Sequence, residues 1–457
     1  MNATLHPPPV DRLARNLEMG GGRYALYPPP QTFRPFSDSQ FTTAVHTSNG
    51  DPIPALLALH FDVPAAYRSS FCRADSPIRI QDRNRADTYC DRLVREIGLV
   101  GSLFDRDRDV VEIHLAPGMT RWLNPAQVGE LLESLGRHFH LRGAGGIDLA
   151  MTLDLDTPAP VPLRDWVMLG FNRISVSSAA IADSVRDSQE QASEVARLVE
   201  RVHSAGIANL RIEVPYGLAG QSDRSFEALI AAVIAAQPER IGLRYCAQSE
   251  SDDFACETAS RHMAHARMLL AGADALEAAG YLHIGVDVFA RANDPLVAAQ
   301  RRNRIHRDAL GFGTHGATDL IGFGVGAISQ LGSCHAQNPR DQETWESRID
   351  RGQRAVDRGI ELQEDDQIRA TVLQSILCHG RINTAMISAL HGVEFGSYFA
   401  IELERLGPLF EDGSLSQEQD AIVLDRVARL SSRAVARHFD PDSAPLSSAS
   451  VRPLTLG

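Results

Sequence analysis

The feature that most constrains the fold of this chain is an alternation of strand-like and helix-like segments from about residue 54 to residue 246. Short apolar segments bounded by turn residues are typical of buried strands, and they occur at 54–60, 110–115, 147–154, 172–177, 209–215 and 240–246. Amphipathic helical patterns lie between them, at 85–100, 125–139, 163–169, 189–205 and 222–236. Strands that alternate with helices need right-handed crossovers, so a parallel α/β sheet is expected.

The length of this alternating region predicts a partial barrel. About 190 residues are too few for a complete eight-fold barrel, so an open (β/α)6 barrel of the TIM type is expected. In such a barrel the functional site lies at the carboxyl ends of the strands. Those ends are His60, Leu115 to Thr120, Asp154, Ser177 to Ala179, Glu213 to Tyr216, and Tyr245 with Cys246.

Composition excludes several classes of function. The chain has 457 residues, 44% of them hydrophobic, and a formal net charge of -13, which argues against a general nucleic-acid surface. No apolar run is long enough to cross a bilayer, and no signal-peptide core is present at the start. A cytoplasmic protein that does not bind membranes is therefore expected.

The six cysteines, Cys72, Cys90, Cys246, Cys256, Cys334 and Cys378, lie far apart in the sequence. No pair has the close spacing of a zinc ribbon or a CxxC redox motif. Free thiols that pack as small hydrophobic groups are favoured over metal ligands.

The remaining sequence divides into an arm and two further regions. Residues 1–50 are rich in Pro, Gly and Thr and predict an arm that is either disordered or packed across the site, where it would bring Arg23 and Tyr24. The barrel is assigned to 51–295, a barrel extension with a Gly-rich segment to 296–364, and a helical C-terminal domain with its tail to 365–457. In the extension, Gly322, Gly324 and Gly326 have the spacing of a cofactor loop, but close backbone approach explains glycines equally well.

Several short motifs, taken in order, resemble the oxygen-independent coproporphyrinogen III oxidases, a family of radical S-adenosylmethionine (SAM) enzymes. They are Arg23-Tyr24, Tyr27-Pro28, Gly170 to Ser175, Tyr216 to Leu218 with Gln221, Phe289 to Arg291, His306-Arg307, Thr318 to Ser329, and Ala336 to Asn338. The resemblance implies a partial (β/α)6 barrel of the radical SAM type with an N-terminal arm and a helical C-terminal domain. It also implies an oxidoreductase of haem synthesis that converts two propionates of coproporphyrinogen III to vinyl groups.

The cofactors implied by the resemblance are a 4Fe–4S cluster and SAM, and the cluster ligands are missing. The family holds its cluster with the three thiolates of CxxxCxxC in the loop after the first strand. The matching positions here are Ala66, Ser70 and Arg73, and no CxxxCxxC occurs anywhere in the chain. Cys72 lies one residue from a ligand position, and one thiolate cannot hold a cluster.

The SAM pocket implied by the resemblance is also eroded. His60 replaces an aromatic residue at the end of the first strand, and Pro117 interrupts the second loop, where the family has glycines. Polar SAM-binding positions have become Thr152, Ala179 and Ser188. Two remnants persist, because Glu213 keeps an acid and Ile328 keeps its match.

Five residues are candidates for binding a tetrapyrrole substrate or ligand: Arg23, Tyr24, Arg291, His306 and Arg307. Arginine binds carboxylates bidentately, and a coproporphyrin-like ligand carries four of them. Surface salt bridges are the alternative. His60 is a candidate haem or tetrapyrrole ligand, with a hydrogen-bonded core histidine as the alternative. Other pairs, His138 with His140, His262 with His265, and Asp154 with Asp156, favour solvent-facing or turn roles.

These observations lead to one hypothesis and two alternatives. The favoured hypothesis is a divergent paralogue that has lost the cluster and acts as a tetrapyrrole-binding or regulatory protein of haem and porphyrin metabolism. The first alternative is an oxidoreductase that still decarboxylates coproporphyrinogen III or acts on a tetrapyrrole without a cluster. The second is an interaction partner of a catalytic relative.

Overall fold

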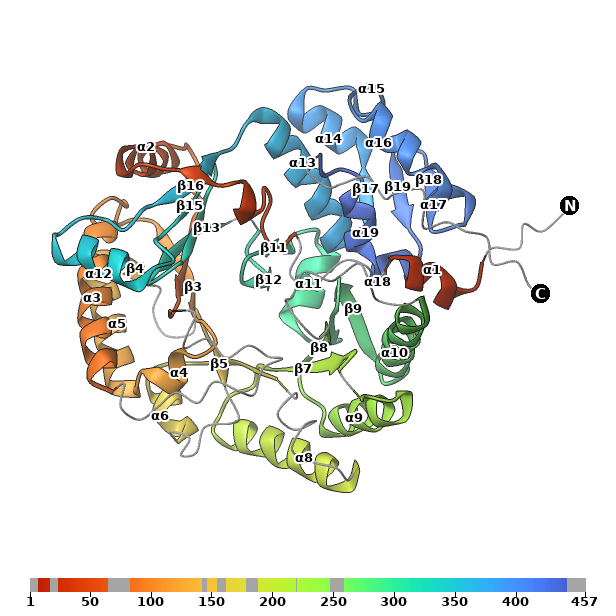
Figure 1. Ribbon diagram of the computed structural model, residues 1–457, viewed down its shortest axis with the longest axis horizontal. Coiled ribbons are helices and arrows are strands. Elements are labelled where there is room, and N and C mark those ends of the chain that lie inside the picture. The colour runs from red at the N-terminus through yellow and green to blue at the C-terminus, as the bar shows by residue number, and fades with distance from the viewer. Residues whose placement is uncertain are drawn as a thin grey trace, which may run out of the picture.

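A computed structural model describes residues 7–16, 24–64, 83–141, 146–153, 162–177, 188–218, 220–246, 259–316 and 318–441 of the chain. Within these residues the main element is a 14-stranded mixed sheet. Figure 1 shows this sheet curving around the centre of the molecule, with helices along its outer side and the C-terminal elements near its open edge.

The six predicted strands are all present as a parallel series. They are β2 (Leu56–Phe61), β3 (Asp109–Leu115), β5 (Asp148–Leu153), β6 (Arg173–Ser177), β7 (Leu210–Tyr216) and β8 (Arg240–Tyr245). Each pairs in parallel with the next along the chain. The intervening helices are α3 (Arg83–Gly101), α5 (Pro125–His138), α6 (Leu163–Met168), α8 (Ser188–Ser204) and α9 (Asp223–Ala236). The short elements α4 (Met119–Trp122) and β4 (His140–Leu141) complete this region.

One further parallel strand was not predicted as part of the barrel. Strand β13 (Thr318–Phe323), from the segment assigned to the extension, pairs in parallel with β2 along its whole length. The sheet then continues in antiparallel pairs through β14 (Ile328–Leu331), β15 (Cys334–Gln337), β16 (Arg358–Glu361) and β1 (Arg34–Pro35). At the other end, β10 (Val288–Arg291) and β9 (Tyr281–Gly285) extend the sheet beyond β8. The place of β13 in the barrel depends on long-range pairing, because β13 and β2 are far apart in the sequence.

The two faces of the barrel strands have different residues because side chains alternate along a strand. Leu59 and Phe61 of β2, with Ile113 and Leu115 of β3, pack in the core that the outer helices share. The residues between them, including His60 and His114, therefore lie on the inner face of the barrel. The other polar residues at these alternate positions of the strands also face the barrel interior.

The C-terminal region is helical, as predicted, but it also contains a small sheet. Strands β17 (Arg381–Asn383), β19 (Ala421–Leu424) and β18 (Leu415–Glu418) form a three-stranded antiparallel sheet. The region's helices are α13 (Glu364–Gln374), the π-helical η5 (Ser375–His379), α14 (Thr384–His391), α15 (Phe395–Tyr398), α16 (Ala400–Arg405), α17 (Gly407–Glu411), α18 (Arg426–Leu430) and α19 (Ser432–Arg437). A second hydrophobic core joins these elements to β9, β10 and α11 (Pro295–Arg301).

The N-terminal arm is ordered over its described residues and connects both halves of the molecule. Helix α1 (Pro9–Asn16) packs against α10 (Ala259–Ala278) and α18, while β1 pairs with β16. Helix α2 (Asp38–Asn49) begins at a capping box in which Ser37 and Gln40 bond each other's backbone N–H. The described parts of the arm are thus packed against the rest of the molecule, and the Ser-x-x-Gln pattern was an overlooked signal for α2.

The glycines at the end of β13 and just after it allow close backbone approach, one of the two roles considered for them from the sequence. A Cβ on Gly322 would lie 2.6 Å from the carbonyl oxygen of Ile328. Gly324 has φ +99°, and a Cβ there would lie 2.4 Å from the carbonyl oxygen of Asp62 and 2.5 Å from the Tyr89 hydroxyl. Both positions therefore require glycine for packing.

A buried carboxyl group on α3 holds this segment in place. Glu96 accepts hydrogen bonds from the backbone N–H of Gly324 (2.8 Å), the Asn338 amide (2.8 Å) and the Trp345 indole N–H (3.1 Å). Burial raises the pKa of Glu96 to about 7, against the lowering effect of these three donors. The outer helix, β13 and the helix α12 (Gln342–Asp350) are thereby joined at one interior point.

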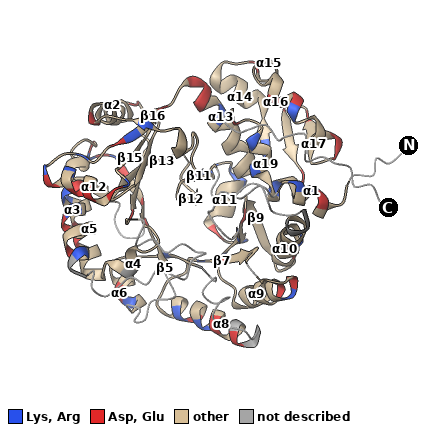
Figure 2. Ribbon diagram, viewed as in Figure 1, with Lys and Arg blue, Asp and Glu red and all other residues tan. Residues whose placement is uncertain are grey.

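The outer helices carry charges of both signs. Figure 2 shows basic and acidic residues interleaved along α3, α8 and α12. Among the described helices, none combines the length and the apolar character that a membrane-crossing segment needs.

We expect Gly324→Ala to lower the free energy of unfolding by roughly 3 kcal/mol, since it adds both backbone strain and overpacking. Urea unfolding followed by circular dichroism measures the change. Gly332→Ala is the matched control, because a Cβ at Gly332 meets nothing within 4 Å. Equal stability of the two variants would contradict the role given to Gly324.

We expect Glu96 to make the protein less stable as the pH rises. The folded-state pKa of Glu96 is about 7, above its ordinary value of 4.5, so the folded state binds this proton more tightly than the unfolded state. Its contribution is fully present below pH 4.5 and is lost as the pH passes through about 7. The stability difference between wild type and Glu96→Gln should shrink by up to about 3 kcal/mol between pH 5 and pH 8. A difference independent of pH would show that the Glu96 pKa is not raised.

Candidate functional site

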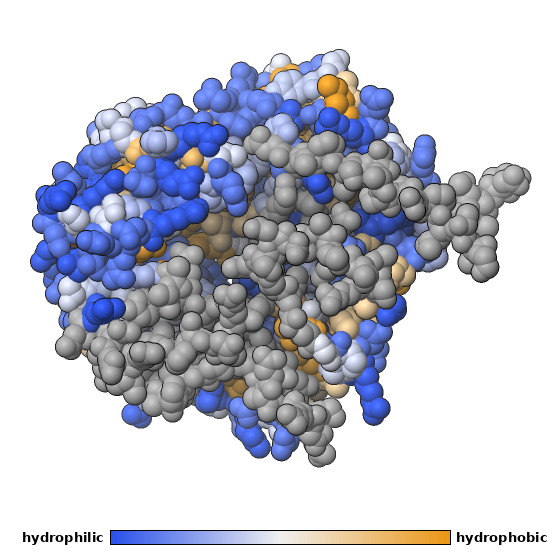
Figure 3. Space-filling model, in the orientation of Figure 1, coloured by the Kyte–Doolittle hydropathy of each residue, from blue (hydrophilic) through white to orange (hydrophobic). Residues whose placement is uncertain are grey.

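Two histidines lie side by side on the inner face of the barrel, at the carboxyl-terminal halves of β2 and β3. His60 and His114 are directly paired in the parallel register. Their Nδ1 atoms are 3.1 Å apart, and the Oδ2 atom of Asp62 lies 4.0 Å from the Nε2 atom of His60. Figure 3 shows the described atoms receding near the middle of the face that it views. His60 was predicted from the sequence, whereas His114 and Asp62 were missed.

The tautomers and charges of this group follow from its surroundings. Burial, the neighbouring His60 and then Arg173 lower the pKa of His114 well below its usual range, so His114 is neutral. Asp62 is held in place because its Oδ1 atom accepts a hydrogen bond of 2.8 Å from the Val63 backbone N–H. A polar residue between two buried apolar ones, as in Ile113-His114-Leu115, was the sequence signal for the missed residue.

Glu213, a predicted remnant of the SAM pocket, lies buried on β7 and forms an ion pair with Arg211. Its carboxyl group occupies the space in front of Gly242 on β8, where a Cβ would lie 2.4 Å from it. Glu213 is therefore a paired interior acid and not a solvated one. Thr152, on β5, is also buried, and its carbonyl oxygen accepts a hydrogen bond of 3.2 Å from the Thr120 hydroxyl.

The inner wall of the barrel also contains a buried ion network. Arg173 on β6 pairs with Glu112 on β3, and its Nη1 atom lies 3.3 Å from Asp148 on β5. Burial raises the pKa of Glu112 against the opposing effect of Arg173. Nearby, Arg240 forms two hydrogen bonds to Asp294, of 2.8 and 3.1 Å. These pairs compensate buried charges and link neighbouring strands.

Two of the predicted ligand residues, Tyr24 and Arg307, are brought together in the interior. Arg307 lies on the hairpin of β11 (His306–Asp308) and β12 (Gly311–Gly313), and its Nη1 atom donates a 2.7 Å hydrogen bond to the Tyr24 carbonyl oxygen. The Tyr24 hydroxyl donates to Asp440 at 2.9 Å. Burial lowers the pKa of Arg307 to about 10, assisted by the nearby charge of Arg433. Arg307 is thus an interior link between arm, hairpin and C-terminal domain, and not a surface salt bridge.

The other predicted ligand residues are scattered. Arg291 lies near the amino-terminal end of β8, away from His60, and its Nη1 atom donates to the Gln237 carbonyl oxygen at 3.5 Å. His306 is half-buried on β11, and burial lowers its pKa. Ile328 begins β14 and packs its backbone against Gly322. Arg23 lies outside the described residues. Of the candidates that the structure describes, Tyr24 and Arg307 are in contact, and Arg291 lies apart from them.

The positions that match the family's cluster ligands, Ala66, Ser70 and Arg73, fall outside the described residues, as does Cys72. The same holds for Ala179 and for the acid pair Asp154 and Asp156, while Ser188 is described only as the first residue of α8. The interpretations of these positions remain those made from the sequence.

The described cysteines do not provide a metal centre. Cys90, Cys246, Cys334 and Cys378 are all free and buried. Burial raises the pKa of Cys90, Cys334 and Cys378 to about 12, so their thiolates are disfavoured. Within the described ranges, no three His, Cys, Asp or Glu side chains come together in a way that could hold a metal ion. These residues do not fit a 4Fe–4S cluster, which needs converging thiolates.

The predicted histidine pairs lie outside the barrel interior. His138 packs against Gly98 and Gly101, and the Nδ1 atom of exposed His140 is 2.8 Å from Asp109. His265 is buried against Tyr245. The solvent-facing role favoured from the sequence fits His140, but it is wrong for His265, which is buried.

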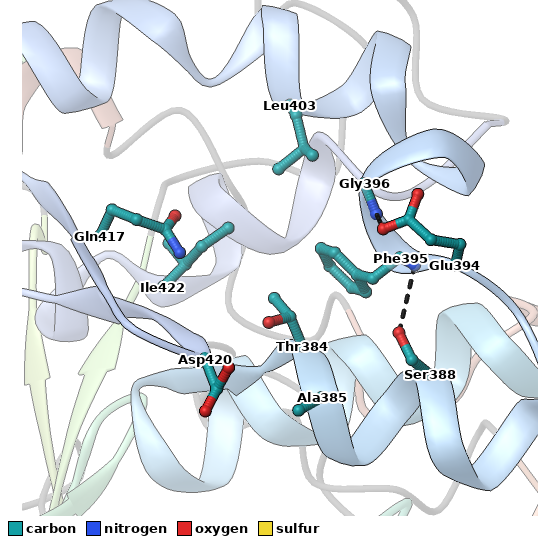
Figure 4. Close-up of a pocket in the computed structure, with 10 residues that line it drawn as sticks. All are labelled: Thr384, Ala385, Ser388, Glu394, Phe395, Gly396, Leu403, Gln417, Asp420 and Ile422. Carbon is teal, nitrogen blue, oxygen red and sulfur yellow. Dashed lines mark hydrogen bonds between the residues drawn. The ribbon is translucent and has the colours of Figure 1, made fainter.

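A separate pocket of about 330 Å³ lies in the C-terminal domain. Figure 4 shows Phe395, Leu403 and Ile422 on its apolar side, with Thr384 and Asp420 opposite. The Ser388 hydroxyl accepts a 3.2 Å hydrogen bond from the Phe395 backbone N–H at its edge. This pocket holds none of the residues predicted as functional.

Comparison with known proteins identifies similar chains over nearly the whole length. The chain is 30% identical to the oxygen-independent coproporphyrinogen III oxidase of Pseudomonas aeruginosa over 446 residues, which cover 94% of this chain and 95% of the relative. It is 30% identical to the Escherichia coli protein of that description, over 94% of both chains. No family model matches the sequence.

A solved structure agrees with these relatives. The coproporphyrinogen III oxidase of Escherichia coli, a radical SAM enzyme, superposes with a TM-score of 0.79 at 28% identity, over 92% of this chain and 97% of that one. The predicted fold class and the resemblance seen in the motifs are therefore both confirmed.

We expect Arg173→Met to lower the free energy of unfolding by about 3–5 kcal/mol, because it leaves the buried Glu112 carboxyl without its cation. Arg197→Met is the matched control, since Arg197 pairs with Glu194 on an exposed helix face and its loss should cost less than about 1 kcal/mol. Chemical denaturation of both variants measures the difference. Adding Glu112→Gln should recover part of the loss, and a lack of recovery would contradict the coupling.

Proposed function

The chain belongs to the family of oxygen-independent coproporphyrinogen III oxidases, and from that premise we propose that it is a tetrapyrrole-binding protein without the family's iron–sulfur chemistry. It acts in haem or porphyrin metabolism as a carrier or regulator. The observation that carries the proposal is the combination of a barrel kept over almost the full length with the absence of CxxxCxxC from the sequence.

The loss of the cluster follows from ligand chemistry. A 4Fe–4S cluster of this type needs three thiolates from one loop, which leaves one iron free for SAM. Ala66 offers no donor atom, the Ser70 hydroxyl is a poor substitute for a thiolate, and Arg73 brings a permanent positive charge. Without the cluster there is no electron donor for SAM cleavage, so no step of the family's radical reaction is assigned to this chain.

The interior of the barrel supports retained binding of a ligand. Its inner face carries the pair of His60 and His114, with Asp62 close by, at the end where barrels of this type place their sites. Ion pairs between Arg173 and Glu112 and between Arg211 and Glu213 fix side chains on this inner face. The described residues thus combine a firm scaffold with a polar, partly accessible region facing the barrel interior.

The positions of the predicted candidate residues indicate which of them belong to the proposed site. Tyr24 and Arg307 act by joining the arm to the hairpin, which shapes the interior without contact to a ligand. Arg291 lies at the other end of the strands and is left out of the proposed site. Among the residues predicted from the sequence as ligand or cofactor contacts, we propose that His306, on the same hairpin as Arg307, and Glu213 are the ones that can contact the ligand.

We expect anaerobic reconstitution with iron and sulfide to load the chain with far less than the four irons of a 4Fe–4S cluster, and SAM to remain uncleaved. Metal-free coproporphyrin III should nevertheless bind, measured as a change in its fluorescence. Stoichiometric cluster formation with SAM cleavage would overturn the proposal, and so would the absence of porphyrin binding.

A variant with Ala66→Cys, Ser70→Cys and Arg73→Cys provides the matched control, and the Escherichia coli relative a positive one. Iron uptake by the triple variant but not by the wild type would assign the loss to these three positions. Co-purification with a catalytic relative, without porphyrin binding, would instead support the interaction-partner alternative.

A further inference from the structure

The contact between His60 and His114 has a specific geometry. Their ring planes are inclined by only 23°, and their ring centroids are 5.2 Å apart. The two Nδ1 atoms are only 3.1 Å apart. The distance between the centroids exceeds this by roughly the width of one ring. The rings therefore meet edge to edge, and the in-plane Nδ1 atoms point at each other. This arrangement suits an N–H···N hydrogen bond and leaves no room for a metal ion between the rings.

The protons of the pair can be assigned from this geometry. Two facing Nδ1 atoms share a single proton, since a neutral imidazole has one donor and one acceptor nitrogen. The Asp62 carboxylate, 4.0 Å from the Nε2 atom of His60, favours a proton on that nitrogen. The Nδ1 atom of His60 is then the acceptor, His114 donates from its own Nδ1 atom, and the lone pair of His114 lies on its Nε2 atom.

The charged groups around His114 keep it neutral. His60 lies on β2 and Asp62 directly follows that strand, while Glu112 is on the same strand as His114 and Arg173 is on β6. Burial, His60 and Arg173 all disfavour the imidazolium form and lower the pKa of His114. Within the described part of the chain, the Nε2 atom of His114 takes part in no hydrogen bond. A neutral imidazole with a lone pair is thus present on the inner face of the barrel.

We propose that the Nε2 atom of His114 binds the metal centre of a metallated tetrapyrrole, with His60 and Asp62 as positioning residues. This inference rests on the proposed function and narrows its ligand from tetrapyrroles in general to those that carry a metal such as iron. A metal-ligating histidine almost always donates its other ring N–H to an acceptor, which sets its tautomer and raises its basicity. His60, backed by Asp62, is that acceptor. The ligand must also be neutral to bind metal, as His114 is.

On the β13 side, the pair is bordered by backbone and not by a side chain. Gly322 on β13 is the register partner of His60 on the side away from His114. Gly322 has no side chain, and the backbone of Ile328 requires this. A side chain from β13 therefore cannot crowd His60 from that side.

The test compares two probes on the full chain: iron(III) coproporphyrin III and metal-free coproporphyrin III. Absorption and resonance Raman spectra report a nitrogen axial ligand, and fluorescence reports the metal-free probe. We expect wild type to show the axial-nitrogen signature. His114→Phe should lose that signature and weaken iron-porphyrin binding by about 100-fold or more, a loss that should exceed any change in metal-free binding.

The positioning residue gives a separate prediction. His60→Phe removes the acceptor but keeps the ring volume, so it should retain the axial-nitrogen signature, shift the iron–nitrogen stretching frequency downward and weaken binding by roughly 10- to 100-fold. Added imidazole should restore the signature to His114→Gly. His140→Phe, on exposed β4, is the control and should behave as wild type.

The outcomes separate the two levels of the hypothesis. An axial-nitrogen signature that survives His114→Phe overturns the assignment of His114 but not the proposed function. Metal-free binding alone, with no axial ligand in wild type, also overturns the inference. Failure of the wild type to bind either probe overturns the proposed function itself. A circular dichroism spectrum and a thermal unfolding midpoint like those of the wild type show that His114→Phe is folded.

Discussion

The parallel pairing of β2 with β13 on one side and β3 on the other is the interaction on which the rest of the structure depends. It joins a strand near residue 60 to one near residue 320 and so places the Gly-rich segment against α3. Glu96 then secures this contact with three hydrogen bonds in the buried interior. The same pairing puts His114 and Gly322 on either side of His60. Both the fold and the candidate site therefore follow from one set of backbone hydrogen bonds.

Charge compensation stabilises the rest of the barrel interior. Arg173 neutralises acids from two neighbouring strands, and Arg211 neutralises Glu213. Arg433 of the C-terminal domain lies 3.1 Å from Asp287 at the turn between β9 and β10. Burial opposes ionisation of Asp287, yet Arg433, Arg211 and Arg307 together hold its pKa below the ordinary value. These interior pairs are formed by residues of the barrel strands and the C-terminal domain, so this charge compensation does not depend on the loop after β2.

The proposed function and the proposed role of His114 both depend on side chains that are held in fixed positions on the strands. A ligand-binding imidazole needs a fixed tautomer and a fixed direction, and the facing rings of His60 and His114 provide both. The family chemistry depended on residues in one loop, whereas the histidines lie on strands. Loss of the loop cysteines therefore leaves the strand-borne groups in position.

The amino-acid sequence by itself determined the alternating elements, and the six barrel strands lie within a few residues of their predicted bounds, because periodicity and turn residues act locally. It also determined that no CxxxCxxC motif exists. It did not reveal β13 as a barrel strand, since an apolar segment carries no record of a partner about 260 residues away. Only the tertiary structure decided that Arg307 is an interior link, that Arg291 lies at the far end of the barrel, and that His114 faces His60. Those outcomes depend on which strands become neighbours, and strand neighbours are chosen by long-range packing.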